Sequence, residues 1–292
     1  MSNLTDLNIT FWGTSRFSTI VLDEMAREGA LPTLIITAPA KPKGRHLELT
    51  SSDVKIWADA HGVPTLEPTK LDPEFSRQLS KVNSQLFIVA SYGKIIPRAI
   101  LDQPKYGTLN VHPSSLPKLR GASPIQSAIL EEVPVGIEHE AAVTIMQIDE
   151  EVDHGDIIAQ AKIKVPDWPP KGSELEEMLG VLGGKLLVKT IPEWTARKIT
   201  PQKQTHEKAT YSKKMTKGSG HIDLNDDPSR VYRKIRAFDI WPRAYFSTQR
   251  NGREIRVVVT DAILKDGKLI VKRVIPEGKR EMNYEEFLRG QK

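Results

Sequence analysis

Thr108-Leu-Asn-Val-His-Pro-Ser-Ser-Leu-Pro-Lys-Leu-Arg-Gly-Ala-Ser-Pro124 is the stretch that decides the fold of this chain. Its first five residues alternate polar and apolar side chains until Pro113 stops the pattern, which is typical of a short strand. Side chains two residues apart on a strand share a face. Asn110 and His112 are therefore predicted to point the same way.

A loop and a helix are expected after this strand. Residues 114–117 hold two serines and a proline, and Ser123 precedes a helix predicted over Pro124–Leu130 as its N-cap. In open α/β sheets, ligands bind where strands leave the sheet at their carboxyl ends. The sequence thus places an amide and an imidazole together at a ligand-binding edge.

The chain on either side predicts an α/β fold. Asn8–Trp12 and Leu34–Thr37 are expected strands around a helix over Phe17–Glu28, and the apolar run Gln85–Ala90 is typical of a central parallel strand. These elements predict a Rossmann-like, doubly wound, mostly parallel sheet. Only Gly13 follows the first strand, so the glycine fingerprint for a dinucleotide is missing.

The 292 residues are enough for about two domains. Residues 1–191 carry the α/β pattern, with a last helix expected over Ser173–Thr190. Residues 192–210 are polar and lack a periodic apolar face, as in a linker. Residues 211–292 hold short strands separated by glycine turns, which predicts a small C-terminal β-barrel of the OB-like type.

Composition excludes several classes of site. The chain has no cysteine, which rules out disulfides, thiolate metal sites and a cysteine nucleophile, and which fits a reducing cytoplasm. No apolar run approaches the roughly 18 residues of a membrane span, and the polar start Met1–Leu7 lacks the core of a signal peptide. A cytoplasmic protein without a membrane segment is expected.

Positive charge is concentrated late in the chain. Arg197–Arg256 holds fifteen lysines and arginines against six acidic residues, a net +9, which leaves −4 of the total +5 for all other residues. Such a block indicates either a polyanionic partner or an ordinary solvated surface, and charge alone does not separate the two. An expected loop at Ala38–Thr50 adds Lys41, Lys43 and Arg45; taken alone, it is more typical of a charged surface loop.

A third polar side chain is expected beside Asn110 and His112. The turn Asp149–Asp156 holds five acidic residues but lacks the regular ligand spacing of a calcium loop. Within it, Asp153 precedes a glycine turn and is hypothesised to face Asn110 and His112.

Asparagine, histidine and aspartate without a covalent nucleophile suit direct attack of an amine on an acyl carbon. Amide and imidazole N–H groups donate to the oxyanion, and a carboxylate takes the amine proton directly or through water. No Gly-x-Ser-x-Gly elbow is present, which disfavours that class of hydrolase. By itself, an Asn-x-His pair on a strand is most often structural.

Longer motifs carry a family resemblance. The chain resembles the 10-formyltetrahydrofolate-dependent formyltransferases, and within that superfamily the methionyl-tRNA formyltransferases, at Asn110-Val-His-Pro-Ser-Ser-Leu-Pro117, Arg120-Gly-Ala-Ser-Pro-Ile125, Thr144-Ile-Met-Gln-Ile-Asp149 and Asp153-His-Gly-Asp-Ile157. Further similar segments are Phe11–Phe17, Ala38–Arg45 and Ile235–Pro242. The matches span nearly the whole chain.

The resemblance implies an enzyme of translation initiation that takes 10-formyltetrahydrofolate as cosubstrate, uses no metal and acts as a monomer on initiator methionyl-tRNA. It implies roles for three groups of residues: Asn110, His112 and Asp153 in catalysis; Ser114, Ser115, Leu116, Pro117, Ala90, Tyr92 and Ile95 around the folate; and Lys41, Lys43 and Arg45 on the tRNA. The segment Ala90–Pro97 is expected to meet the pterin largely through its backbone, and the C-terminal domain to lie along tRNA phosphates.

Some residues depart from the family pattern. Pro113 and Ser115 stand where glycine and leucine are usual, His154 stands where threonine is usual, and Leu47-Glu-Leu49 replaces a more basic sequence. Two alternatives therefore stay open: a formyltransferase for an amino-sugar nucleotide or glycinamide ribotide, and a non-catalytic RNA-binding protein. A small nucleotide substrate does not account for the +9 stretch, and the complete Asn110, His112 and Asp153 set disfavours a non-catalytic protein.

Overall fold

A computed structural model describes residues 7–43, 48–134, 136–250 and 252–290. The chain divides into two compact units, each assembled from separate segments. Unit 1 comprises Met1–Arg120, Ala141–Ile163 and Glu177–Tyr211, and unit 2 comprises Gly121–Glu140, Lys164–Glu176 and Ser212–Lys292. Among the described residues, no helix is long and apolar enough to cross a membrane.

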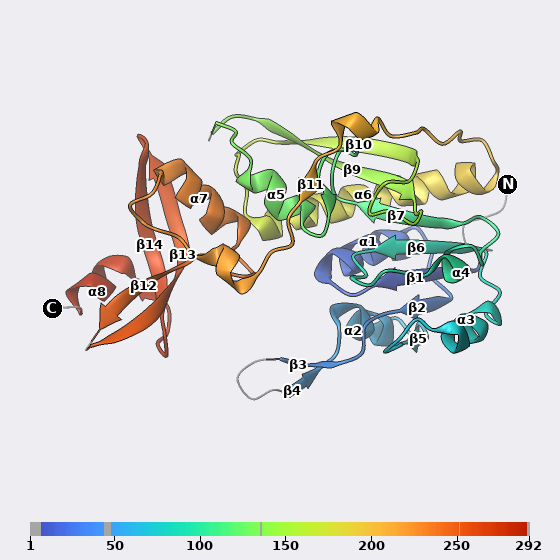
Figure 1. Ribbon diagram of the computed structural model, residues 1–292, viewed down its shortest axis with the longest axis horizontal. Coiled ribbons are helices and arrows are strands. Elements are labelled where there is room, and N and C mark those ends of the chain that lie inside the picture. The colour runs from blue at the N-terminus through green and yellow to red at the C-terminus, as the bar shows by residue number, and fades with distance from the viewer. Residues whose placement is uncertain (1–6, 44–47, 135, 251, 291–292) are drawn as a thin grey trace. The chain divides into compact units, whose positions relative to one another are not determined.

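Unit 1 is built on a seven-stranded sheet, visible in Figure 1 with β7, β6, β1 and β2 side by side. The pairs β1–β2, β1–β6, β6–β7 and β2–β5 are parallel, whereas β7–β9 is antiparallel. This arrangement confirms the predicted mostly parallel, Rossmann-like sheet. In spatial order the strands are β10 (Ile157–Val165), β9 (His139–Gln147), β7 (Thr108–His112), β6 (Leu86–Ala90), β1 (Ile9–Gly13), β2 (Leu34–Ile36) and β5 (Thr65–Leu66).

Helices connect the strands of unit 1, and two of them begin at a side-chain cap. Ser52 caps the second helix by accepting a hydrogen bond from the backbone N–H of Lys55, and Asp72 caps the third by accepting from Phe75. The helices are α1 (Arg16–Arg27), α2 (Asp53–Ala60), α3 (Pro73–Ser80), α4 (Arg98–Leu101) and α6 (Gly172–Thr195).

Two segments differ from expectation. Helix α6 continues to Thr195, past the expected end at Thr190, because Ile191 is buried beside Pro192 and stabilises the added turn. The loop expected over residues 38–50 is a hairpin of β3 (Lys41–Lys43) and β4 (Glu48–Thr50). Residues 44–47, which include Arg45, lie outside the described residues.

An aromatic cluster packs on one face of the sheet of unit 1. The ring of Trp12 meets Phe75, Phe87 and Tyr92 edge-on, with centroids 6.3, 5.6 and 5.2 Å away. The Tyr92 hydroxyl is buried without a hydrogen-bond partner in the described part of the chain, and burial raises the pKa of Tyr92 to about 12. The residue therefore acts as an apolar core side chain with an unsatisfied hydroxyl.

We expect Tyr92→Phe to keep or raise stability at pH 7, by up to about 1 kcal/mol, because it removes an unsatisfied polar group. In the wild type, the neutral phenol is favoured by folding, so its stability falls as pH rises from 10 towards about 12. The advantage of Tyr92→Phe should therefore widen at high pH. Urea midpoints at pH 7 and pH 11 measure both effects, with the exposed Tyr211→Phe as control. A lower midpoint for Tyr92→Phe at both pH values would contradict the assignment.

Unit 2 holds the C-terminal antiparallel strands that the sequence predicts. Four strands pair in the order β12 (Tyr245–Arg250), β13 (Arg253–Lys265), β14 (Lys268–Pro276) and β15 (Met282–Asn283). Helices α7 (Pro228–Ala237) and α8 (Tyr284–Arg289) pack on this sheet, and Val257, Val274 and Phe287 fill its core. Pro124 begins α5 (Pro124–Leu130), which contacts α7; Ser123 precedes it without capping it through its side chain.

Two short strands, β8 (Arg120–Gly121) and β11 (Tyr211–Ser212), form a separate small sheet. The 3-10 helices η2 (His206–Lys208) and η3 (Lys217–Gly220) lie on either side of β11 in sequence. Residues 196–210 otherwise lack regular structure, apart from a bridge between Gln202 and Ile157.

Candidate active site

The candidate site lies where three parallel strands end. Gly13 at the end of β1 pairs with Ala90 at the end of β6, and Val89 pairs with Asn110 on β7. The carboxyl ends of β1, β6 and β7 therefore lie side by side, which is the ligand-binding edge of an open α/β sheet.

Asn110, His112 and Asp153 meet at this edge. Asn110 Nδ2 donates a hydrogen bond to Asp153 Oδ1 at 3.3 Å, and His112 Nδ1 lies 3.6 Å from Asp153 Oδ2. The His112 side chain is buried, and 16% of the Asp153 side chain is exposed. The structure thus brings the three residues together and leaves part of the Asp153 side chain exposed to solvent.

The His112 ring is held from both sides. Its Nε2 lies 3.0 Å from the backbone oxygen of Leu119, while its Nδ1 faces Asp153. Because each ring nitrogen points at an oxygen, a protonated ring can donate to both, and a neutral ring to one of them. The ring orientation is therefore set before any ligand binds.

The turn that presents Asp153, residues 149–156, is tightly built. Asp153 has a φ of 49°, a left-handed conformation that aspartate tolerates better than most residues. A Cβ atom added at Gly155 would lie 2.1 Å from the backbone oxygen of Gln147 on β9. Gln147 also donates its N–H to Asp156 O at 2.9 Å. We call residues 149–156 the Asp153 turn; it lies against the end of β9 with no room for a side chain at Gly155.

The predicted folate loop after β7 is fixed by side chains of β9 and β10. Thr144 Oγ1 donates to Ser114 O at 2.7 Å and accepts from Leu116 N at 3.2 Å. Gln160 Nε2 donates to Leu116 O at 2.9 Å. Thr144 and Gln160 have no predicted role in the sequence, because neither stands near the loop in the chain. Ser114 and Leu116 are buried, whereas Ser115 and Pro117 are half-buried.

The predicted folate residues at the end of β6 and in the following loop differ in how far their side chains are exposed. Ala90 is buried, and its carbonyl accepts from Ser18 Oγ at 2.6 Å. Tyr92 points into the aromatic core, while Ile95 is 88% exposed. Of these, only Ile95 offers its side chain to a ligand, so Tyr92 can contribute through its backbone alone.

Lys41 on β3 lies close to this loop. Lys94 Nζ donates to the backbone oxygens of Pro68 and Thr69, at 2.7 and 3.0 Å. Burial, and then the nearby positive charge of Lys41, lower the pKa of Lys94. The exposed Lys41 therefore adds positive charge next to the loop that leaves β6. Lys43 pairs with Glu48 through the backbone of the hairpin.

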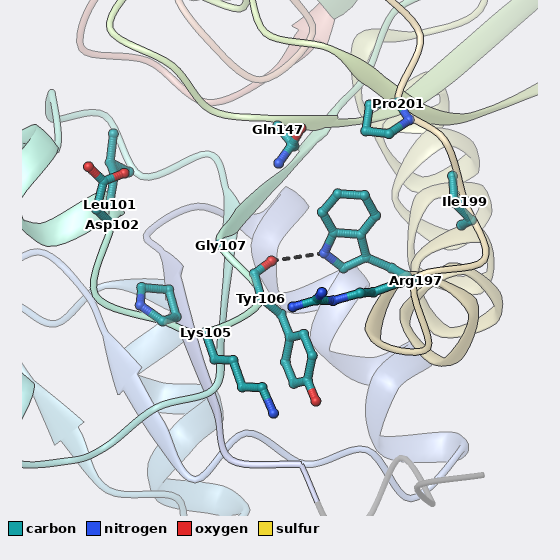
Figure 2. Close-up of a pocket in the computed structure, with 11 residues that line it drawn as sticks. Leu101, Asp102, Lys105, Tyr106, Gly107, Gln147, Arg197, Ile199 and Pro201 are labelled. Atoms are coloured by element: carbon teal, nitrogen blue, oxygen red, sulfur yellow. Dashed lines mark hydrogen bonds between the residues drawn. The ribbon is translucent and has the colours of Figure 1, made fainter.

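A cavity of about 440 Å³ opens at the other end of β7 (Figure 2). Trp194 Nε1 donates to Tyr106 O at 2.9 Å in its wall, where Lys105 and Arg197 also lie. Its lining residue Gly107 immediately precedes β7. At about 3.3 Å per residue, His112 is roughly 16 Å further along that strand. The cavity is therefore separate from the Asn110, His112 and Asp153 cluster. Across the described ranges, no group of three or more histidine or acidic side chains is arranged to hold a metal ion.

Comparisons with known proteins agree with the fold. Residues 7–191 match the formyl transferase family, and residues 214–265 match the formyl transferase C-terminal domain. A methionyl-tRNA formyltransferase from Geobacillus sp. (strain WCH70) is 36% identical over 306 residues, which cover 97% of this chain and 94% of that protein.

Solved structures share the fold at lower identity. The methionyl-tRNA formyltransferase from Clostridium thermocellum is 19% identical with a TM-score of 0.62, over 92% of this chain and 98% of that one. An N-formyltransferase from Helicobacter canadensis, in complex with folinic acid and dTDP-3-aminofucose, is 17% identical with a TM-score of 0.59, over 89% of each chain. Since the family match spans more than half of the chain, and a relative over 30% identical covers nearly all of it, the resemblance seen in the sequence is confirmed: the chain belongs to the formyl transferase family.

Proposed function

We propose that this protein transfers the formyl group of 10-formyltetrahydrofolate to the amino group of methionine on initiator methionyl-tRNA. The observation that carries the proposal is the meeting of Asn110, His112 and Asp153 at the carboxyl end of β7. The similarity to a named methionyl-tRNA formyltransferase over 97% of the chain supports this choice of acceptor. The protein would act as a monomer in the cytoplasm, at translation initiation.

The proposed reaction is a direct attack of the amine on the formyl carbon. A new C–N bond forms while the carbonyl oxygen becomes an oxyanion, and collapse of this intermediate breaks the bond between the formyl carbon and N10 of the folate. The Asn110 amide has two N–H donors, so one can hold Asp153 while the other meets the oxyanion. His112 stabilises the same oxyanion by sharing one of its ring N–H groups, which in the structure already face Leu119 O and Asp153.

Asp153 is the proposed acceptor of the amine proton. Its carboxylate lies against both Asn110 and His112, and part of the side chain is exposed on the side from which an amine or water would approach in this proposal. The proton lost by the attacking amine is taken up by Asp153, directly or through water, and returned to N10 of the leaving tetrahydrofolate. This transfer leaves formyl-methionyl-tRNA and tetrahydrofolate with a neutral amine at N10, and Asp153 is ionised again.

The folate would lie across the loops that leave β6 and β7. Ser114, Ser115, Leu116 and Pro117 would line one side, and Ala90, Tyr92 and Ile95 the other. The loop backbone is held by Ser18, Thr144 and Gln160, so its N–H and C=O groups offer fixed partners to a pterin. The solved N-formyltransferase with folinic acid supports a folate on this fold.

The tRNA would be held by phosphate contacts from two regions. One is the hairpin with Lys41, Lys43 and Arg45; the other is the +9 stretch Arg197–Arg256. In this proposal residues 1–191 are the catalytic domain, 192–210 the linker and 211–292 the tRNA-binding domain.

The alternative is formyl transfer to an amino-sugar nucleotide or glycinamide ribotide by the same three residues. It is favoured by one observation: the TM-score to the Helicobacter canadensis enzyme, 0.59, is close to the 0.62 of the Clostridium thermocellum enzyme. The test is formyl transfer from 10-formyltetrahydrofolate to methionyl initiator tRNA, with dTDP-3-aminofucose and glycinamide ribotide assayed in parallel. Formylation of the tRNA alone supports the proposal, and formylation of a small amine alone replaces it.

We expect Arg45→Ala to lower kcat/KM for methionyl-tRNA about tenfold, since one cation on a phosphate contributes about 1.4 kcal/mol. The KM for 10-formyltetrahydrofolate should stay the same, because the loss concerns tRNA only. Initial rates at limiting tRNA measure the effect, with the exposed Arg77→Ala on α3 as the matched control. If the two variants behave alike, the hairpin is an ordinary charged surface.

A further inference from the structure

A buried glutamine holds the Asp153 turn. Gln204 is only 4% exposed. Its Nε2 donates to the backbone oxygen of Asp153 at 2.9 Å and to that of Gly155 at 2.7 Å. Both N–H donors of the amide are thus used on the two carbonyl groups that bracket His154. Gln204 comes from the segment 192–210, whose polar sequence predicts only a linker.

A buried arginine in turn holds Gln204. Arg120 is 2% exposed, and its Nε and Nη2 donate to Gln204 Oε1 at 3.1 and 2.7 Å. Its Nη2 also donates to His206 Nδ1 at 2.9 Å. A guanidinium is a rigid fork of donors, so it fixes both partners in one geometry.

His206 contacts the residue between the two held carbonyl groups. Its ring stacks on that of His154, with centroids 4.0 Å apart and planes inclined by 8°. His154 Nδ1 lies 2.6 Å from Asp149 Oδ2 at the start of the same turn. All three residues 153–155 therefore touch Gln204 or His206, and both of these are held by Arg120.

The same segment also supports His112. Thr210 Oγ1 accepts from the backbone N–H of Leu119 at 2.9 Å, and Leu119 O lies 3.0 Å from His112 Nε2. Residues 204–210 thus reach both the histidine and the aspartate of the candidate site.

We propose that Arg120, Gln204 and His206 are positioning residues that keep the Asp153 carboxylate against Asn110 and His112. The proposal rests on the catalytic role given to Asp153 above. Its physical basis is the left-handed backbone of Asp153, which is sparsely populated and persists only where surrounding contacts hold it. Without Gln204, two carbonyl groups lose their donors and the turn loses that support.

Gln204→Glu tests this role with little change in side-chain size. The carboxylate still accepts from Arg120, but it has no N–H for Asp153 O and Gly155 O. We expect kcat for formyl transfer to fall about 100-fold, the loss typical of a group displaced by an ångström, with both KM values within about threefold. Gln202→Glu is the matched control, since Gln202 is exposed on the same segment; it should leave kcat unchanged.

Hydrogen exchange followed by mass spectrometry gives a readout independent of activity. In Gln204→Glu, amides of residues 149–156 should exchange at least about tenfold faster than in the wild type, whereas Gln202→Glu should match the wild type. If Gln204→Glu does not fold, His206→Ala replaces it, because His206 is exposed. In His206→Ala, amides of residues 149–156 should also exchange faster than in the wild type, by a smaller factor than expected for Gln204→Glu. Unchanged exchange, or faster exchange with unchanged kcat, would overturn the proposal.

The Asp153→Asn background separates this inference from the proposed function. If Gln204 acts through Asp153, then Gln204→Glu should lower the residual rate of Asp153→Asn by less than about threefold, because the two residues work as a unit. A full 100-fold further loss would overturn the positioning role while leaving Asp153 catalytic. If the wild type formylates none of the three acceptors, the proposed function fails, and the exchange experiment alone decides whether Gln204 holds the turn.

Discussion

Asp153→Asn will lower kcat for formyl transfer by about 10²- to 10⁴-fold, the range that a general base contributes. The variant keeps the size and shape of the side chain but cannot take up the amine proton. Its new N–H groups also face donors, because Asn110 Nδ2 and His112 Nδ1 both point at this carboxylate in the wild type. The affinity for 10-formyltetrahydrofolate should change by less than about threefold, since the loops assigned to the folate do not include Asp153.

Steady-state kinetics with methionyl-tRNA and a calorimetric titration with the folate separate these two effects. Glu151→Gln is the matched control, because it makes the same chemical change at an exposed position of the same turn. It should leave both values as in the wild type. Unchanged turnover in Asp153→Asn would remove Asp153 from the mechanism and leave Asn110 and His112 as the only candidates for catalysis.

The pair on β7 could be predicted from sequence because it needs only local information. Alternation over Thr108–His112 indicates a strand, and a strand places Asn110 and His112 on one face. The approach of Asp153 to Asn110 and His112 is harder to predict from the sequence. Its approach depends on how β9 pairs with β7, which residue patterns do not specify, although the turn and its glycine could be recognised.

The support of the site could not be predicted in the same way. Gln204 and His206 stand in a polar segment without periodicity, and nothing in such a segment distinguishes a buried glutamine from an exposed one. Arg120 lies in a family motif, but its burial follows from contacts with residues more than 80 positions away. Long-range polar contacts of this kind follow from tertiary structure and leave no local pattern.

The sequence does not predict the hairpin of β3 and β4, for a related reason. Its strands are three residues long, and one contains Pro42, a composition typical of a loop. The sequence predicts too early an end for helix α6, because proline ordinarily ends a helix. In the structure α6 continues through Pro192, and the burial of Ile191 outweighs the lost hydrogen bond. In both cases tertiary contacts override a local signal.

Gly155→Ala should be as damaging to catalysis as the loss of Gln204 and should also lower stability. The added Cβ would lie 2.1 Å from Gln147 O and 3.0 Å from Gln147 C, both backbone atoms of β9. Those atoms cannot retreat without disturbing the pairing of Leu109 with Gln147. The turn must therefore move away from the sheet and carry Asp153 away from Asn110. We expect a cost of about 2–3 kcal/mol, typical of overpacking, and a fall in kcat of about 100-fold.

Thermal unfolding and kcat measured on the same preparation test this prediction, because a cost of 2–3 kcal/mol corresponds to a fall in Tm of roughly 4–12 °C. Gly218→Ala is the control: its nearest atom would be Thr216 Oγ1 at 3.7 Å, an ordinary contact, so neither value should change. Comparison with Asp153→Asn is the decisive step. That variant should lose more turnover than Gly155→Ala for a smaller fall in Tm, because it adds no backbone clash. A Gly155→Ala protein with wild-type kcat would mean that the Asp153 turn can shift without consequence, which no catalytic role for Asp153 permits.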